Sequence, residues 1–203
     1  MGKISLHSII LGHIVSLKGI EVDKSKIELI ANLRTPKSVK DFRSFLGHAS
    51  FYRRFIKDFS VISRSLCYLL SKDIIFEWTK NCEKAYVQLK NKLISTPIMQ
   101  PLNWSSPFEI MCDTSDYAIG VVLGQRKKKK PYVIYYASKT LDSAQMNYST
   151  TKKELLAVVF ALNKYRSYLV GSPIVVFSDH AALKYLLSKK DTKPRFIRCI
   201  LLL

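Results

Sequence analysis

Alternation of hydrophobic and polar positions marks the start of the chain. Residues 9–22 alternate in this way and are interrupted at Lys18-Gly19, a dipeptide typical of tight turns. A period of two places every second side chain on the same face of a strand. The pattern therefore predicts a hairpin of two short strands.

Helical spacing of hydrophobic residues follows the hairpin. Thr35-Pro36 ends a first helix, and Ser38 and Asp41 have the spacing of a capping box, in which side chains accept hydrogen bonds from otherwise unbonded backbone N–H groups. A helix should therefore begin near Ser38.

Two more amphipathic stretches are expected in the first half, one from residue 52 toward residue 70 and one after residue 79. The hydrophobic positions that carry the three helical periods are Phe42, Phe45, Leu46, Ala49, Tyr52, Phe55, Ile56, Cys82, Ala85, Tyr86, Leu89 and Leu93. Residues 96–107 then break the periodicity with Pro97, Pro101 and Pro107, so we expect a domain boundary or linker there.

The second half of the chain favours strands first and a long helix later. The three strand-like segments are FEIMCD at 108–113, AIGVVLGQ at 118–125 and YVIYYASK at 132–139. A basic turn at residues 126–130 joins the last two. A helix at 151–168, a strand at 174–179 and a helix at 181–187 complete the order β-β-β-α-β-α. Three meander strands and a helical crossover predict a mixed sheet with helices packed on it.

The positive charge of the chain favours one class of binding partner. The chain of 203 residues has 33 Lys and Arg against 15 Asp and Glu, a formal net charge of +18, with 48% hydrophobic residues. Such a chain can bury a core, and its positive charge favours a polyanion such as nucleic acid over a neutral partner. Solvated lysines without a specific partner are the alternative.

The sequence lacks the features of zinc-binding, membrane-spanning and secreted proteins. The four cysteines, Cys67, Cys82, Cys112 and Cys199, have no zinc-ligand spacing, and no apolar run reaches the length of a membrane span. The N-terminus has no signal-peptide pattern. We expect an intracellular protein, in a cytoplasmic particle or the nucleus and not secreted, that has no contact with membranes and no small-molecule cofactor.

Three carboxylates are candidates for a site. Asp113 and Asp179 each end a predicted strand, and in parallel strands both would emerge at the same edge of the sheet. Glu154 lies in the predicted first turn of the long helix, whose N-terminus would face those strand ends. A cluster of carboxylates near a basic surface suits Mg²⁺ with a phosphate substrate.

Each carboxylate also has a purely structural interpretation. Asp113 could form an Asx turn in the segment DTSD, Glu154 stands at capping-box spacing from Thr151, and Asp179 could cap the helix that follows it. Spacing alone does not decide between these roles and metal binding.

A family resemblance adds to this interpretation. The segments FEIMCDTSDYAIGVVLGQ, IYYASKTLDSAQMNYSTTKKELLAVVFAL and VVFSDHAALKYLL resemble the ribonuclease H domain of pol polyproteins from gypsy-type long-terminal-repeat retrotransposons. Upstream, ILGHIVSLKGIEVD and TPKSVKDFRSFLGHASFYRRFIKDFS resemble the end of the reverse transcriptase of the same polyproteins. The resemblance implies a palm end and thumb or connection at 1–95, a linker at 96–107 and an α/β ribonuclease H-like domain at 108–203.

The resemblance also implies roles for individual residues. Asp113, Glu154 and Asp179 match the catalytic metal ligands of the family, whereas Asp116, the second acid of its segment, is expected to support the turn. His180, beside the third ligand, is expected to orient local structure.

The implied chemistry is hydrolysis of the RNA strand of an RNA–DNA hybrid. Two Mg²⁺ ions, or Mn²⁺, would lie about 4 Å apart in such a centre. Two divalent ions at that distance repel strongly, so an anionic ligand must bridge them, and Asp113 is the candidate bridge.

Six basic residues are expected to hold phosphates of the hybrid without reading its bases. They are Arg53, Arg54, Lys57, Arg126, Lys127 and Lys128. For the basic turn, a solvated hairpin tip is an equally good interpretation.

The sequence departs from the family in two respects. It contains no adjacent pair of aspartates, which the polymerase centre of these enzymes needs, and it ends at Leu203 before the strand and helix that bring a fourth acidic ligand. We therefore expect a domain truncated at its C-terminus that acts with the remainder of the polyprotein. The alternative is a catalytically inactive, basic nucleic-acid-binding remnant.

Overall fold

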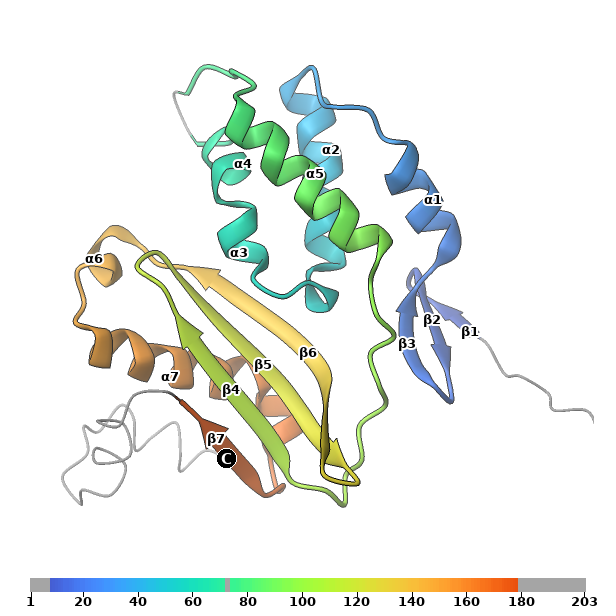
Figure 1. The fold of residues 1–203 in the computed structure, drawn as a ribbon, viewed down its shortest axis with the longest axis vertical. Helices are drawn as coiled ribbons and strands as arrows, with labels where there is room; N and C mark the ends of the chain where they lie inside the picture. The colour runs from blue at the N-terminus through green and yellow to red at the C-terminus, as the bar shows by residue number, and fades with distance from the viewer. Residues whose placement is uncertain (1–7, 72–73, 179–203) are drawn as a thin grey trace, which may run out of the picture. The chain divides into compact units, whose positions relative to one another are not determined.

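The computed structural model describes residues 8–71 and 74–178, and the chain divides into two compact units, Met1–Pro101 and Leu102–Leu203 (Figure 1). The division falls within residues 96–107, where the prolines interrupt the periodicity. Asp179, His180 and the helix predicted at 181–187 lie outside the described residues.

The first unit begins with a small antiparallel sheet. Its strands are β1 (Ser8–Ile10), β2 (His13–Ser16) and β3 (Gly19–Val22), in the order β1-β2-β3. The pairing of β2 with β3 around Leu17-Lys18 confirms the predicted hairpin, and β1 adds a strand that the pattern did not indicate.

Helices make up the rest of the first unit. They are α1 (Lys24–Asn32), α2 (Val39–Phe51), the 3-10 turn η1 (Arg53–Phe55), α3 (Phe59–Ile62), α4 (Arg64–Tyr68) and α5 (Lys80–Ile94). Ser38 caps α2 by accepting from the backbone N–H of Asp41, as the sequence predicted. The expected periods of α2 and α5 are confirmed, because α5 buries all five of its predicted hydrophobic residues.

The predicted amphipathic stretch at 52–70 is not one helix. It forms η1, α3 and α4, and Asp58, just before α3, has a left-handed backbone with φ of 59°. A left-handed residue cannot continue a right-handed helix, so the chain changes direction there although the hydrophobic period continues.

Part of the proline-rich segment is integrated into the first unit. Ile20 and Met99 exchange two backbone hydrogen bonds, with N···O distances of 2.8 and 2.9 Å, and Met99 is buried. Gly19 has φ of 133°, and a Cβ built there would lie 1.9 Å from the Met99 carbonyl oxygen. Only glycine allows this close approach of two backbones.

The second unit is a mixed sheet with a long helix packed on it. Strands β4 (Phe108–Thr114), β5 (Ala118–Lys127), β6 (Lys130–Thr140) and β7 (Ile174–Phe177) lie in the order β6-β5-β4-β7, and β7 is parallel to β4. The short helix α6 (Ser143–Met146) precedes α7 (Thr150–Leu169). Within the described residues, the predicted mixed sheet and its element order are confirmed.

The core of the second unit lies between the sheet and α7. Alternate residues of β4, namely Phe108, Ile110 and Cys112, face the helix and are buried against it. The Tyr165 hydroxyl of α7 donates to the carbonyl oxygen of Val121 at 3.0 Å. The remaining buried hydrophobic residues of this core include Ile119, Leu123, Ile134, Ala157, Val158, Ala161, Leu162 and Leu169.

Gln125 fastens the start of the second unit to the sheet. Its buried side chain accepts from the backbone N–H of Asn103 at 2.9 Å and donates to the carbonyl oxygens of Asn103 at 2.7 Å and Ser106 at 2.9 Å. Residues 103–106 are therefore held by side-chain hydrogen bonds and do not form a free linker.

No helix in the described ranges, 8–71 and 74–178, has the length and hydrophobicity needed to cross a membrane.

Candidate metal centre

Three chain segments meet at one end of the second sheet. Figure 1 shows β4 and β7 pointing the same way, with the start of α7 at the same end. Parallel pairing was the condition for the two strand ends to lie at the same edge, and the register pairs Met111 with Phe177. The carboxyl ends of two parallel strands thus lie beside each other, which is where sites form in open sheets.

Glu154 projects from α7 onto the strand ends. Its Oε1 accepts a hydrogen bond from the Thr114 hydroxyl at 2.7 Å, and its Oε2 accepts one from the Ser178 hydroxyl at 3.0 Å. Thr114 is the last residue of β4, and Ser178 follows β7. The side chain is 7% exposed. Glu154 therefore ties the helix to both parallel strands.

The capping interpretation of Glu154 is wrong. The N-cap of α7 is Ser149, and Glu154 lies in the second turn of the helix, not in its first turn as the sequence suggested. Its carboxylate oxygens accept from side chains of other elements. The N-cap lies two residues before Thr151, which moves Glu154 beyond the backbone N–H groups that a cap would serve.

Asp113 lies at the same end of β4 on its other face. Successive side chains of a strand alternate, and Cys112 and Thr114 face α7, so Asp113 points away from the helix and is exposed. Its cross-strand partner is Gly120, which has no side chain to cover it. Asp113 therefore lies at the end of β4 on the face opposite the one that Glu154 contacts through Thr114.

The turn after β4 is closed by Ser115. Its backbone N–H donates to the carbonyl oxygen of Ala118 at 2.9 Å, and its hydroxyl accepts from the Ala118 N–H at 3.1 Å. The Asx-turn role considered for Asp113 is therefore filled by another residue. Asp113 keeps its carboxylate at the open end of the strand.

Asp116 is held by a lysine of the long helix. The Lys153 ammonium lies 3.3 Å from Oδ1 of Asp116 and donates to the Asp116 carbonyl oxygen at 3.4 Å. This contact agrees with the supporting role expected of Asp116. Lys153 itself was not singled out from the sequence, because a lysine in an amphipathic helix usually indicates a solvated face.

The third predicted ligand, Asp179, lies outside the described residues, as does His180. Within the ranges that the structure describes, no group of three or more His, Cys, Asp or Glu side chains gathers into a metal site. Asp113 and Glu154 are the two predicted ligands for which the structure gives positions.

Cys112 shows that the interior beside Glu154 is apolar. Burial, with a further contribution from the Glu154 charge, raises the pKa of the Cys112 thiol from 9.0 to about 12. The Glu154 carboxylate thus has apolar core on one side and two hydroxyl donors on the other. Removal from water strengthens charge interactions, and a carboxylate there binds a cation more strongly than an exposed one does.

The donor set suits a hard divalent cation. Carboxylate oxygens are the ligands that Mg²⁺ and Mn²⁺ prefer, and hydroxyl donors that orient a ligating carboxylate are a usual feature of metal sites. Glu154 has two such donors, and Asp113 is open to solvent. By donor chemistry, these two carboxylates suit the metal that the resemblance implied.

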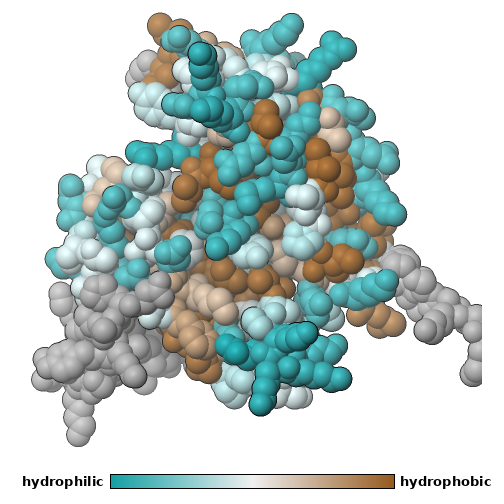
Figure 2. Space-filling view, in the orientation of Figure 1, coloured by the Kyte–Doolittle hydropathy of each residue, from teal (hydrophilic) through white to brown (hydrophobic). Residues whose placement is uncertain are grey.

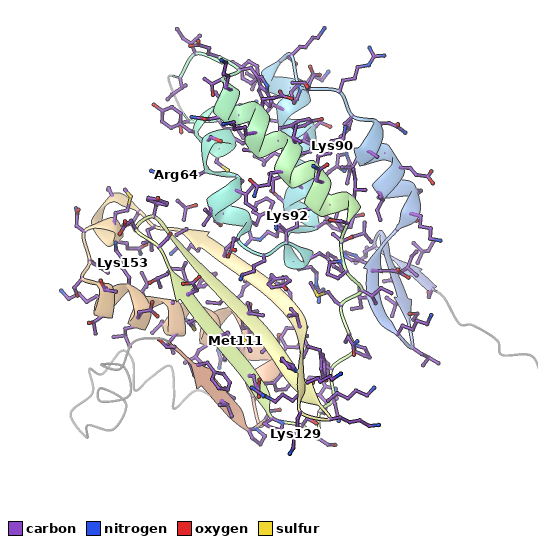
Figure 3. All side chains as sticks on the ribbon, in the orientation of Figure 1. Arg64, Lys90, Lys92, Met111, Lys129 and Lys153 are labelled. Carbon is purple, nitrogen blue, oxygen red and sulfur yellow. The ribbon has the colours of Figure 1, made fainter. Side chains whose placement is uncertain are left out.

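The predicted phosphate contacts of the second unit lie far from this centre. Figure 3 shows Lys129, in the turn between β5 and β6, at the opposite end of the sheet from Lys153. The ten residues of β5 correspond to about 30 Å. Lys127 and Lys128 are exposed there, and Figure 2 shows hydrophilic side chains gathered at this end. The tip cannot contact a phosphate bound at Asp113.

Arg126 already has an internal partner. Its Nε lies 2.6 Å from Oε1 of Glu109, a buried carboxylate of β4. This ion pair offsets the burial of the Glu109 charge, so Arg126 has a structural role beside any phosphate contact. In the first unit, Arg53 and Arg54 are half-buried and Lys57 is exposed.

The family comparison places the mixed sheet of the second unit in the ribonuclease H-like class. Residues 103–203 match the RNase H-like domain found in reverse transcriptase. The chain is 36% identical over 188 residues to the retrovirus-related Pol polyprotein from transposon 412 of Drosophila melanogaster, which covers 93% of this chain and 15% of that protein. It is also 36% identical over 201 residues to the Pol polyprotein from transposon gypsy of the same species, covering 93% and 19%.

The chain belongs to the Pol polyproteins of long-terminal-repeat transposons and corresponds to a part of their reverse transcriptase and RNase H region. It spans about a fifth or less of the curated relatives just described. A solved foamy viral protease-reverse transcriptase, in complex with RNA/DNA hybrid, has the same fold with a TM-score of 0.75 and 21% identity over 96% of this chain and 27% of that chain.

Three residues of the site were missed by sequence reasoning. Thr114, Ser178 and Lys153 hold the acidic residues, and each stands next in sequence to a predicted metal ligand. A hydroxyl directly after Asp113 and directly before Asp179 was a usable signal, because strand ends that converge bring such neighbours together.

Proposed function

We propose that this chain supplies metal ligands of a ribonuclease H that hydrolyses the RNA strand of an RNA–DNA hybrid. The observation that carries the proposal is the Glu154 carboxylate, fixed by Thr114 and Ser178 between the ends of two parallel strands. A buried carboxylate in this position is not needed for capping or for the core, and the family match to RNase H-like domains of reverse transcriptases supports a catalytic role.

Asp113 and Glu154, with Asp179, would hold Mg²⁺ or Mn²⁺. The bound ions supply a water of lowered pKa as nucleophile and stabilise the leaving oxygen of the phosphodiester. Asp113, exposed at the strand end, would supply carboxylate oxygens to the metal. Glu154 keeps one orientation because a hydroxyl donates to each of its oxygens, and Thr114 and Ser178 therefore position a ligand.

A hybrid substrate is supported by charge and by the structural relative. The net charge of +18 favours a polyanion, and a foamy viral protein of the same fold was solved with RNA/DNA hybrid. The exposed Lys57, Lys127 and Lys128 are the proposed phosphate contacts, which bind without reading sequence. The sequence has no adjacent aspartates, so synthesis of DNA is proposed for the whole polyprotein.

Cleavage of a labelled RNA–DNA hybrid in Mg²⁺ tests the proposal. The parent chain should shorten the RNA strand, and Asp113→Asn and Glu154→Gln should each abolish the activity because each loses a ligand charge. Glu28→Gln, which removes a carboxylate from the exposed face of α1, is the matched control and should cleave as the parent does. Equal cleavage by all four proteins would point to a contaminating nuclease and contradict the catalytic role.

A second candidate function is binding of nucleic acid without chemistry. The exposed lysines at the β5–β6 turn favour it, since they lie about 30 Å from the metal centre and can act without it. This function predicts salt-dependent binding of hybrid or duplex that Glu154→Gln leaves unchanged, with no cleavage by any variant. Failure to bind hybrid at low salt would contradict it.

A further inference from the structure

Lys153 is a buried cation in an unfavourable place. Its side chain is only 10% exposed, and it stands in the first turn of α7, where the helix dipole disfavours positive charge. Burying an ammonium group is costly unless a partner compensates it. Its partner, Asp116, has a side chain that is 88% exposed, so water screens the Asp116 charge and weakens its compensation of the ammonium.

Lys153 and Glu154 both form hydrogen bonds to the segment that follows Asp113. Glu154 accepts from Thr114 at the end of β4, and Lys153 contacts the carboxylate and the carbonyl oxygen of Asp116 two residues later. Two successive residues of a rigid helix therefore fix the start and the middle of the turn. Asp113 directly precedes this clamped segment, so the clamp also fixes the backbone from which Asp113 projects.

The contact between Lys153 and Asp116 also gives Asp116 a different environment from Asp113, the carboxylate three positions earlier in the sequence. Asp113 and Asp116 both carry the charge and the oxygen atoms that a divalent cation requires. Oδ1 of Asp116 lies 3.3 Å from the Lys153 ammonium, which compensates its charge, whereas Asp113 is open at the strand end.

We propose that Lys153 is a positioning residue of the metal centre. Its contacts with Asp116 hold the turn after β4 in place and keep the Asp116 carboxylate paired with the ammonium. Asp113 is then the carboxylate of this segment that binds the cation. The proposal rests on the proposed function, because it assumes that Asp113 and Glu154 bind a metal. The Lys153 side chain acts through Asp116 and the turn, and it contacts neither metal nor substrate.

Three variants of the full chain test this role. Lys153→Met keeps the length of the side chain and removes its charge, Lys153→Arg keeps the charge, and Lys152→Met removes the charge of the exposed neighbouring lysine as a matched control. Hydrogen exchange of the peptide covering residues 114–118 reports on the clamp without any metal. Electron paramagnetic resonance of free Mn²⁺ reports on the metal centre.

Lys153→Met should speed exchange in residues 114–118 and raise the Mn²⁺ dissociation constant about tenfold, the range found when residues behind metal ligands are removed. Lys153→Arg should recover most of both properties, and Lys152→Met should match the parent in both.

Unchanged exchange in Lys153→Met would overturn the inference, whatever the parent chain binds. Faster exchange with unchanged Mn²⁺ affinity would show a structural clamp only, and would also overturn it. A parent chain whose Mn²⁺ binding is insensitive to Asp113→Asn and Glu154→Gln would contradict the proposed function itself, and the positioning role would fail with it.

Discussion

Single hydrogen bonds decide how Glu154 is oriented. Thr114 and Ser178 each donate to one oxygen of a carboxylate that has apolar core beside it. The loss of either donor leaves a buried, charged oxygen without compensation, which is more harmful than the loss of a bond between neutral groups. The orientation of this carboxylate therefore depends on two hydroxyl groups, one at the end of β4 and one directly after β7.

Thr114→Val should weaken the centre without changing the shape of the strand. The substitution removes the donor and keeps a β-branched side chain, so the free energy of unfolding should fall by about 1–3 kcal/mol. Mn²⁺ affinity should fall as well, because Glu154 gains rotational freedom. Urea denaturation and Mn²⁺ titration measure the two effects, with Thr140→Val at the exposed end of β6 as the control. Equal Mn²⁺ affinity in Thr114→Val and parent would contradict the orienting role.

The raised pKa of the Cys112 thiol predicts that the second unit loses stability at alkaline pH. Its folded-state pKa is raised by burial and the Glu154 charge to about 12, from 9.0. The unfolded chain therefore releases the thiol proton first, and the free energy of unfolding falls as pH rises from about 9 to 12. From pH 8 to pH 10.5 the loss attributable to this thiol is about 2 kcal/mol.

The loss is measured by urea unfolding at several pH values, with hydrogen exchange of peptides from β4 and β5 as the signal for the second unit. Cys112→Val removes the thiol and should flatten the pH dependence by that amount, while the contribution of Tyr165, whose pKa burial also raises, stays common to both proteins. Parallel pH curves for the parent and Cys112→Val would contradict the prediction.

The roles of individual residues were only partly predictable from the sequence. Asp113 and Glu154 could be selected because of their positions after a strand and within a helix. The hydroxyl donors and Lys153 could not, because their roles depend on which elements meet in three dimensions. The capping role considered for Glu154 failed for a similar reason, since T-x-x-E spacing recurs inside a helix as well as at its start.

At the scale of elements, Gly19 links strand β3 to the segment before the second unit. Gly19→Ala would place a Cβ 1.9 Å from the Met99 carbonyl oxygen in a backbone with φ of 133°. The clash and the strain together should lower the free energy of unfolding of the first unit by about 3 kcal/mol. Gly47→Ala is the control: nothing lies within 4 Å of its new Cβ, and it should stabilise α2 by about 0.5–1 kcal/mol. Equal stabilities of the two variants would contradict the account.

The β5–β6 hairpin has a two-residue turn of unusual composition. Lys128 and Lys129 have φ of 51° and 67°, a left-handed conformation that asparagine and glycine adopt more readily. Replacement by Asn-Gly should stabilise the second unit by about 1–2 kcal/mol. The variant with Gln at both positions removes the same charge but keeps both Cβ atoms, and should leave the urea midpoint unchanged. Destabilisation by Asn-Gly would show that the lysines make contacts that hold the turn.

The hydrophobic pattern predicted elements well where one period runs uninterrupted. Helices α2, α5 and α7 follow it, because each buries hydrophobic residues at helical spacing against its unit. Strands β4 to β6 form where the strand-like segments stand. The pattern failed between residues 52 and 70, where the left-handed backbone of Asp58 divides the helix but leaves the hydrophobic spacing intact. Strand β1 was not predicted either, since its three residues are exposed and bury no face.

At the scale of the whole molecule, positive charge should dominate binding of nucleic acid. The affinity for an RNA–DNA hybrid should fall linearly on a logarithmic scale with salt concentration. Joint replacement of Lys127 and Lys128 by Gln should reduce that slope by about one to two and leave Mn²⁺ affinity unchanged, since the hairpin tip lies about 30 Å from the metal centre. An unchanged slope would assign the phosphate contacts to other residues.

The family match and the fold indicate the same ancestry for the chain, and the carboxylates of the candidate site are consistent with the chemistry of that family. Residues 103–203 match the RNase H-like domain of reverse transcriptases, and the described part of that domain brings Glu154 to the ends of β4 and β7. A metal bound by Asp113 and Glu154 is the central claim.

Mn²⁺ titration of the parent chain, Asp113→Asn and Glu154→Gln, followed by electron paramagnetic resonance, tests that claim most directly. We expect saturable binding by the parent and its loss in both variants, with Glu28→Gln equal to the parent. Equal Mn²⁺ binding by all four proteins would show that these carboxylates do not form the centre.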